Sequence, residues 1–409
     1  MNNNINGVQV VSYLQNYYKT TSIGLFVKVG SKNEPERLSG IVHFIEHMLL
    51  KRNTKYKYSN PLRIIEEIGG TINAFTTKEY ICIHGKVLNR HYKLLLGLLL
   101  DLLLYPEFNN NDINIEKNVI LNELWNYINN EEIQCRNKLM NAVLYPHPLS
   151  REILGTGDHI NSFSRNDLLN FHNEIVKRNI VISIVGGGNN EEVLEFLEKK
   201  TSDLQLGSNT DINNFKLAPY NVINENSTNK KNINTISHAI PAVGFNDKNI
   251  VYFNFLATIL RYGSGSILNK VLREEKGLVY YTHAAAYSYE DNGILLISCS
   301  SNKSKNISKI DQELRKIYQF IKNGNITIYQ FNNIKEIVKS HIYFSTENPS
   351  NIMLEIGKRK LFNIQSVGFD YHEMDKINHI IDTLRYEKFV EFTNDIMSKK
   401  ISTMSSICV

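Results

Sequence analysis

A short stretch near the start of the chain combines side chains that bind metals and transfer protons. Residues 40–50 place His43 and His47 four positions apart, with Glu46 between them. On a helix, offsets of three and four return to the same face, so both imidazoles and the carboxylate lie together. The order H-x-x-E-H is the reverse of the commoner H-E-x-x-H zinc motif. The pattern predicts two metal ligands beside a general base.

Two histidines do not complete a zinc site, because zinc needs at least three protein ligands and a catalytic ion keeps a further position open. A helix whose histidines lie in a polar rim would show the same spacing. Glu116 and Glu123 lie seven residues apart in a long helical pattern, on one face after two turns. Glu123 could supply the third ligand, with Glu116 behind it orienting a histidine or the ligand carboxylate. Taken alone, such a pair usually marks a solvated helix face.

The elements that must position these residues follow from hydrophobic periodicity and from glycine and proline punctuation. We expect the H-x-x-E-H helix to begin near Ser39 and to follow a strand at residues 22–30. Segments 71–77 and 80–87 are rich in β-forming residues and could pair as a hairpin. Further elements are expected as helices at 61–68, 91–104, 112–143, 164–176 and 190–200 and a strand at 179–186.

The order of elements then restarts, without a second H-x-x-E-H. Strands are expected near 234–244 and within 279–300, and helices near 248–261, up to 275, at 305–322 and at 326–343. Residues 207–232 are polar and rich in Asn, Ser and Thr, as in a linker. We therefore predict an α+β fold of two similar domains, 1–206 and 233–409, each a mostly antiparallel sheet covered by helices on one face.

Composition narrows the class of protein. The 409 residues suit two domains of roughly 200 each. A net charge of +5 without a basic block does not suggest nucleic acid binding. The four cysteines show no C-x-x-C spacing, and the N-terminus lacks a targeting signal, so a reducing, cytoplasmic setting is expected. The longest apolar run, residues 94–104, is too short to span a membrane.

Three motifs resemble one known family, the pitrilysin/insulinase group of inverzincin zinc peptidases, which includes the mitochondrial processing peptidases and short two-domain bacterial relatives. Residues 40–51 are similar to the family's G-x-x-H-F-x-E-H-M-x-F-K, and residues 69–76 to its G-G-x-x-N-A-F/Y-T. In the family the third zinc ligand is the second glutamate of an E-x-x-x-x-x-x-E pair, 76 positions beyond the second histidine. Glu123 lies at that spacing from His47, with Glu116 as the outer glutamate.

The resemblance implies a role for each of these residues. His43, His47 and Glu123 would hold one zinc ion per chain, and Glu116 would support them. Glu46 would act as the general base on a metal-activated water and later pass a proton to the leaving amine.

The resemblance also implies how substrate is held. An extended peptide would add to an exposed sheet edge formed by Asn73, Ala74, Phe75 and Thr76. A simpler interpretation is that Asn73 makes a turn and Phe75 lies in the core.

Residues 264–280 resemble the family's S-x-L-x-x-x-x-R-x-x-x-G-L-x-Y. The matching Arg273 and Tyr280 would reach the zinc site and bind the substrate backbone and the developing oxyanion. The alternative is a surface arginine and a core tyrosine.

The resemblance implies a zinc endopeptidase that cleaves unstructured peptides inside a closed, clamshell-like chamber. That chamber needs four such domains, so we expect a homodimer or a heterodimer with a related chain. General peptide degradation and trimming of a precursor or leader peptide both remain open. The alternative from another class is a non-catalytic scaffold or partner subunit of a heterodimeric peptidase.

Overall fold

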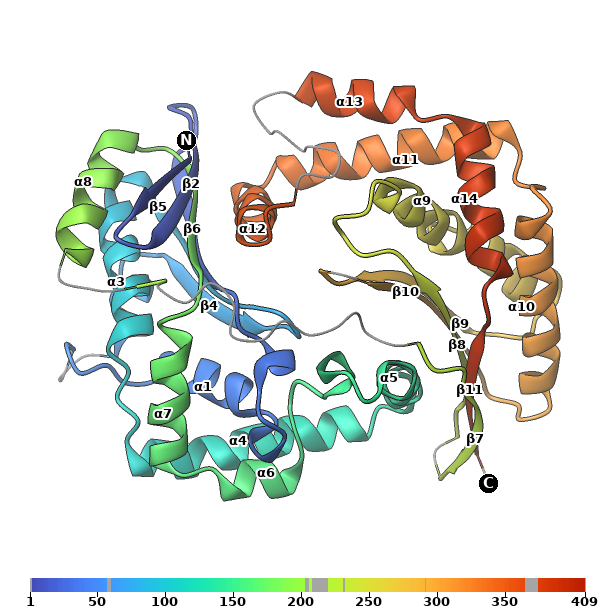
Figure 1. Cartoon of the computed structure of the whole chain (residues 1–409), viewed down its shortest axis with the longest axis horizontal. Coiled ribbons are helices and arrows are strands. Elements are labelled where there is room, and N and C mark those ends of the chain that lie inside the picture. The colour runs from blue at the N-terminus through green and yellow to red at the C-terminus, as the bar shows by residue number, and fades with distance from the viewer. Residues whose placement is uncertain are drawn as a thin grey trace. The chain divides into compact units, whose positions relative to one another are not determined.

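The chain forms two compact units, each built on one β-sheet (Figure 1). The computed structural model describes residues 2–56, 60–202, 206–207, 220–230, 232–290, 292–364 and 374–408. The first unit comprises residues 1–124, 151–214 and 344–364, and the second comprises residues 125–150, 215–343 and 365–409. The predicted α+β class with two helix-covered sheets is confirmed.

The first sheet has six strands in the order β1-β2-β6-β3-β5-β4. Its strands are β1 (Asn2–Ile5), β2 (Val8–Leu14), β3 (Thr20–Val27), β4 (Thr71–Thr76), β5 (Ile81–Leu88) and β6 (Ile180–Gly186). All neighbours pair antiparallel except β2 and β6, which are parallel. The predicted hairpin of β4 and β5 is confirmed, and β4 forms one edge of the sheet.

Helices cover both faces of this sheet, rather than one face as predicted. On one face, Leu95 of α3 (Tyr92–Leu104) lies against Gly85. Gly24 pairs with His84, the neighbour of Gly85, and therefore faces the opposite side. There Gly24 lies against Met353 of α12 (Pro349–Leu361). Remaining helices of the first unit are α1 (Ile41–Leu49), α2 (Pro61–Glu66), α6 (Gly157–Ser162), α7 (Arg165–Ile175) and α8 (Asn190–Thr201).

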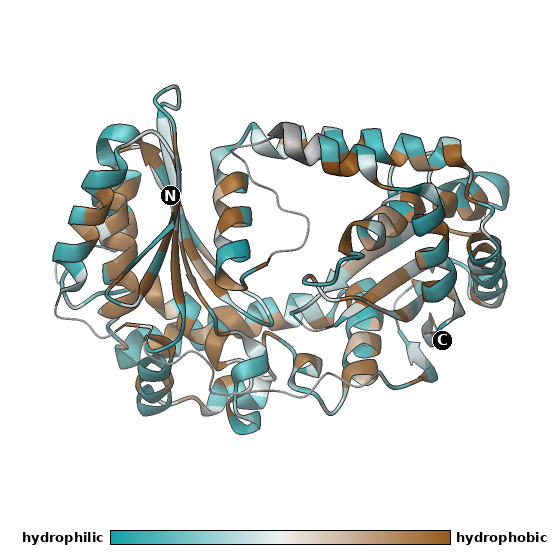
Figure 2. Ribbon diagram, turned by 45° about the horizontal axis from the view of Figure 1, so that its top comes forward, coloured by the Kyte–Doolittle hydropathy of each residue, from teal (hydrophilic) through white to brown (hydrophobic). Residues whose placement is uncertain are grey.

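The second sheet has five strands in the order β7-β11-β8-β10-β9. They are β7 (Asn224–Asn229), β8 (Asn234–Ala242), β9 (Tyr281–Ser288), β10 (Gly293–Ser301) and β11 (Ser402–Cys408), and only β7 and β11 pair in parallel. The described helices that lie wholly within this unit are α5 (Glu131–Leu144), α9 (Ile250–Arg261), η5 (Asn269–Glu275), α10 (Asn306–Lys322), α13 (Met374–Thr383) and α14 (Tyr386–Ser398). Apolar residues fill the strands and the helix faces against them (Figure 2).

Two helices pack on a sheet from the other part of the chain. Helix α5 follows α4 (Asn110–Ile128) and joins the second unit, whereas α12 follows α11 (Ile328–Thr346) and joins the first. The predicted single helix at 112–143 is therefore wrong. Its break lies at Asn130, whose side chain accepts a hydrogen bond from the backbone of Ile133 and so starts a new helix.

The units consequently differ from the two continuous halves that the sequence suggested. The described part of the predicted linker contains strand β7, and residues 208–219 and 231 lie outside the described residues. Strands β1, β2 and β11 were not predicted either, because their Asn, Ser and Gln content hides the strand pattern.

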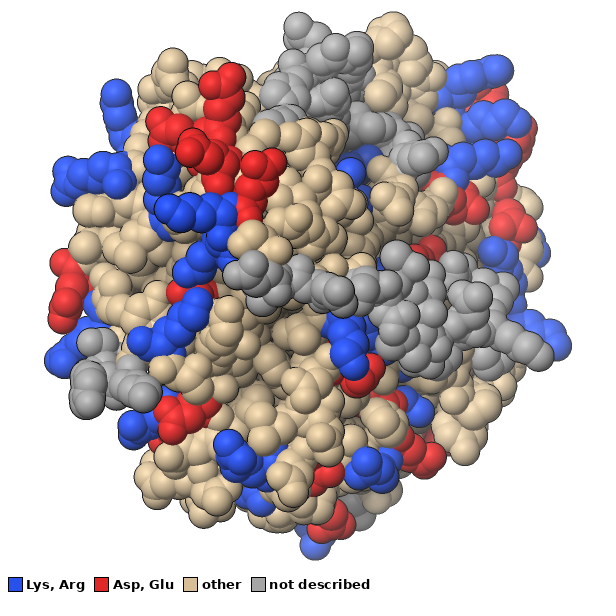
Figure 3. Space-filling model, turned by 60° about the vertical axis from the view of Figure 1, so that its left-hand side comes forward, with Lys and Arg blue, Asp and Glu red and all other residues tan. Residues whose placement is uncertain are grey.

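In the described part of the chain, no helix is both long and apolar enough to cross a membrane. On the face in Figure 3, basic and acidic side chains are interspersed.

Candidate metal centre

The helix that carries the histidines, α1, begins at a tightly fixed point. Gly40 precedes it with a φ of +93°, and a Cβ there would lie 2.7 Å from the carbonyl oxygen of Leu154. The buried Glu34 carboxylate accepts hydrogen bonds from the backbone nitrogens of Gly40 (2.8 Å) and Val42 (2.9 Å). A carboxylate at a helix N-terminus accepts hydrogen bonds from N–H groups that have no partner within the helix, and it interacts favourably with the positive end of the helix dipole. These contacts fix the start of the helix that carries His43.

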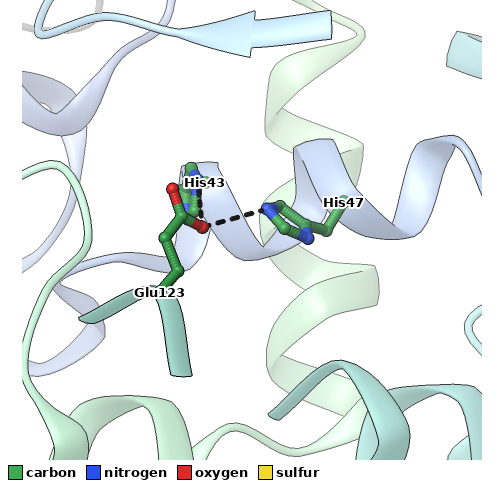
Figure 4. Close-up of side chains that lie close together, drawn as sticks. All are labelled: His43, His47 and Glu123. Atoms are coloured by element: carbon green, nitrogen blue, oxygen red, sulfur yellow. Dashed lines mark ion pairs between the residues drawn. The ribbon is translucent and has the colours of Figure 1, made fainter. Parts of the chain in front are cut away.

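Helix α4 brings the third candidate ligand to α1. The Oε2 atom of Glu123 lies 3.7 Å from Nε2 of His43 and 3.6 Å from Nε2 of His47 (Figure 4). The three candidate ligand atoms all lie within 4.8 Å of one another. Three tetrahedral ligands at about 2.0–2.2 Å from zinc lie roughly 3.3–3.6 Å apart. The donor set and its spacing therefore fit a zinc ion.

Glu116 and Lys51 support this cluster from behind. Glu116 is 1% exposed, and its Oε2 lies 3.0 Å from Nδ1 of His47. Its other oxygen forms an ion pair of 2.5 Å with Nζ of Lys51. A protonated Nδ1 donating to Glu116 leaves Nε2 of His47 as the metal-binding atom. Glu116 thus contacts a candidate ligand, and its role as the outer carboxylate of a metal site stays a prediction.

The two histidines have opposite pKa shifts. Burial, together with the nearby His47, lowers the pKa of His43 to about 4 against the opposing effect of Glu123. Burial also acts to lower the pKa of His47, but the hydrogen bond with Glu116 and the nearby carboxylate of Glu123 prevail and raise it to about 9. In the metal-free chain His47 is therefore a protonated imidazolium that lies between the carboxylates of Glu116 and Glu123 at neutral pH.

Glu46 shares helix α1 with His43 and His47 but is not part of the cluster of three candidate ligands. It is 7% exposed, and its Oε2 accepts a hydrogen bond of 2.9 Å from Oγ1 of Thr76. Burial raises the pKa of Glu46, although the Thr76 hydroxyl opposes that shift. A carboxylate of raised pKa is a stronger base, as proton transfer near neutral pH requires.

The four residues predicted to hold substrate all lie on the edge strand β4. Phe75 is half-buried, with its ring centroid 5.9 Å from those of Tyr80 and His84. Asn73 accepts a hydrogen bond from the backbone of Ala74. The edge position is the one that strand addition needs, and the contact with substrate remains a prediction.

Arg273 and Tyr280 lie in the second unit, and their role remains a prediction. Arg273 is part of the π-helix η5. Tyr280 is 48% exposed and donates a hydrogen bond of 2.9 Å to Glu132. Burial and that hydrogen bond raise the pKa of the Tyr280 phenol to about 12, so it is a hydrogen-bond donor at neutral pH.

Three contributions to the candidate site were not predicted from the sequence: the cap formed by Glu34, the ion pair of Lys51 with Glu116 and the hydrogen bond from Thr76 to Glu46. Lys51 follows His47 by four residues, so helical spacing could have placed it near the site. No sequence pattern marks Glu34 as a cap, because it precedes the helix by a loop.

Comparison with known proteins finds matches to one peptidase family. Residues 9–157 match the family described as insulinase (peptidase family M16), and residues 162–338 match the peptidase M16 inactive domain. An uncharacterized zinc protease of Bacillus subtilis is 26% identical over 87% of this chain and 86% of its own length. A probable mitochondrial-processing peptidase subunit beta of Arabidopsis thaliana is 30% identical over 50% of this chain and 39% of its own length.

Solved structures share the fold over the whole chain. A protease from Helicobacter pylori has a TM-score of 0.88 at 21% identity, covering 100% of this chain and 99% of its own. An M16 inactive-domain protein from Pseudomonas fluorescens has a TM-score of 0.89 at 15% identity, covering 100% and 98%. With both halves matched by adjacent parts of one family, the chain belongs to the M16 (insulinase) family of zinc proteases.

Proposed function

We propose that the chain is a zinc-dependent endopeptidase that cleaves unstructured peptides. The observation that supports this most is the convergence of His43, His47 and Glu123 on one point with Glu46 beside them. A binding protein has no need of a buried carboxylate next to a complete set of metal ligands. One zinc ion per chain is proposed as the cofactor.

The proposed chemistry divides between the metal and the protein. When bound, zinc supplies a positive charge that polarises a peptide carbonyl and makes a nearby water more acidic. Glu46 accepts the proton of the attacking water at its carboxylate and later returns it to the leaving amine nitrogen. Glu116, paired with Lys51, would keep the proton on Nδ1 of His47, so that Nε2 is the atom left to bind zinc.

Peptide binding is proposed at the free edge of β4. An extended peptide there would use backbone hydrogen bonds and so accept varied sequences. Arg273 and Tyr280 are proposed as donors to the substrate and its oxyanion, supplied by a second copy or a related chain.

We further propose a cytoplasmic location, which the four free cysteines support. Trimming of a precursor or leader peptide is one proposed use.

The competing proposal is a non-catalytic scaffold or partner subunit. The M16 inactive-domain match covers residues 162–338, which exclude His43, His47 and Glu123.

The decisive experiment measures zinc by elemental analysis of the purified chain and cleavage of a fluorogenic peptide library with and without a chelator. We expect about one zinc per chain and chelator-sensitive cleavage. No bound zinc and no cleavage, with the chain alone or mixed with related chains, would favour the scaffold.

A further inference from the structure

The Glu46 carboxylate is buried and has one hydrogen-bond partner in the described part of the chain. Glu46 is 7% exposed, so bulk water does little to orient it. Among the residues that the structure describes, the only hydrogen bond to this carboxylate comes from Oγ1 of Thr76, which lies 2.9 Å from Oε2. A carboxylate on a flexible glutamate side chain has two χ angles and a broad terminal torsion to fix. The Thr76 hydroxyl therefore determines which oxygen remains free to accept a proton.

Thr76 is itself held firmly. It is the last residue of β4 and pairs with Ile81 across the hairpin. The turn that follows is locked by Thr77, whose hydroxyl accepts hydrogen bonds from the backbone nitrogens of Glu79 (3.2 Å) and Tyr80 (2.9 Å). The backbone nitrogen of Thr77 also donates to the carbonyl oxygen of Tyr80 at 2.9 Å. The Thr76 side chain thus extends from the rigid end of this hairpin and reaches Glu46.

The same strand is the edge of the sheet. Among the described strands β4 pairs only with β5, so its outer backbone groups can pair with an added peptide. A peptide bound there would further restrict the strand end that carries Thr76.

We propose that Thr76 is a positioning residue that fixes the Glu46 carboxylate and links it to the peptide-binding edge of β4. This inference rests on the proposed peptidase function. It assigns Thr76 a different role from the direct contact with substrate that the family resemblance implies, because its hydroxyl already points to Glu46.

The test compares three variants of the full chain. Thr76→Val keeps the β-branched shape but removes the hydroxyl, Thr76→Ser keeps the hydroxyl, and Thr71→Val is the matched control at the exposed start of the same strand. Steady-state cleavage of one fluorogenic peptide gives kcat and KM, and elemental analysis gives the zinc content. A crystal structure of zinc-loaded Thr76→Val gives the Glu46 pose.

We expect Thr76→Val to lower kcat about ten-fold to a hundred-fold, the usual effect of losing a hydrogen bond to a charged group, with KM within two-fold of wild type. Thr76→Ser and Thr71→Val should keep kcat within about three-fold, and all variants should bind zinc as the wild type does. In zinc-loaded Thr76→Val the Glu46 carboxylate should leave its present position.

Two results would overturn the inference: an unchanged kcat in Thr76→Val, or a raised KM with unchanged kcat, which would make Thr76 a substrate contact. An inactive wild-type protein would instead refute the proposed peptidase function. In that case the crystal structure still decides whether Thr76 positions Glu46, since an unmoved carboxylate in Thr76→Val would contradict it.

Discussion

At the scale of single residues, the candidate site combines three potential ligand atoms with the charged side chains of Glu116 and Lys51. The buried Glu116 carboxylate lies between Nδ1 of His47 (3.0 Å) and the ammonium of Lys51 (2.5 Å). Lys51 stabilises a carboxylate that would otherwise be costly to keep ionised at 1% exposure. An ionised Glu116 in turn makes His47 a better electron donor to a metal.

Removing the Lys51 charge should therefore weaken zinc binding. We expect Lys51→Met to lower zinc affinity about ten-fold, at the low end for partners that contact a ligand. Lys51→Arg keeps the charge and should stay close to wild type. Competition with a chromogenic chelator measures the affinity. Equal affinity of Lys51→Met and wild type would show that Lys51 is only a surface charge.

Zinc affinity should also depend on pH, because zinc must displace the proton on His47. With a His47 pKa of about 9, binding releases a proton at any lower pH. Affinity should then rise about ten-fold from pH 7 to pH 8, after correction for the chelator. In the metal-free chain the same raised pKa makes the stability of the fold fall, rather than rise, as the pH increases. It stabilises the fold below the ordinary histidine pKa, and this contribution is lost as pH rises through 9.

The control for this pH dependence is Glu116→Gln, which removes one of the carboxylates that raise the pKa of His47. Its affinity should change less between pH 7 and pH 8. An affinity of the wild type that is constant over this range would contradict the protonated state of His47.

At the scale of elements, the clustering of the candidate site residues could be predicted from the sequence more fully than the fold around them. Helical offsets placed His43, Glu46 and His47 on one face of their helix, and a seven-residue offset placed Glu116 and Glu123 on one face of a second helix. In the structure, Glu123 lies close to both histidines and Glu116 contacts His47. The break at Asn130 was hidden because apolar periodicity continues through it. The packing of α12 on the first sheet could not be predicted, since it joins residues more than 300 positions apart.

The contact between α12 and the sheet can be tested by adding one methyl group. A Cβ on Gly357 would lie 2.2 Å from Cε2 of the fully buried Phe26. We expect Gly357→Ala to lower the free energy of unfolding by about 1–3 kcal/mol, despite the better helix propensity of alanine. Gly265→Ala meets no atom within 4 Å and is the control. Urea unfolding measures both, and equal stability of the two variants would place α12 elsewhere.

At the scale of the whole molecule, each unit is completed by a helix from the other part of the chain, α5 in the second and α12 in the first. The proposed zinc ligands belong to the first unit and Arg273 and Tyr280 to the second. If a partner chain supplies the latter pair, an active site is a property of two chains.

Mixing two inactive variants tests this sharing. Glu46→Gln lacks the base and Tyr280→Phe lacks the proposed oxyanion donor, so each homodimer should be nearly inactive. After mixing and exchange, half of the dimers are mixed and each has one intact site. Recovery of about a quarter of wild-type activity is expected for a symmetric dimer. No recovery, despite exchange seen by native mass spectrometry, would mean that each chain completes its own site or needs a different partner.

The most direct test of the proposed function is zinc content and peptide cleavage measured together on Glu46→Gln. The substitution leaves His43, His47 and Glu123 intact and removes only the group that accepts the proton. The variant should bind one zinc per chain as the wild type does, while kcat falls about a hundred-fold or more. A zinc-loaded Glu46→Gln that cleaves peptide as fast as the wild type would contradict the proposed chemistry.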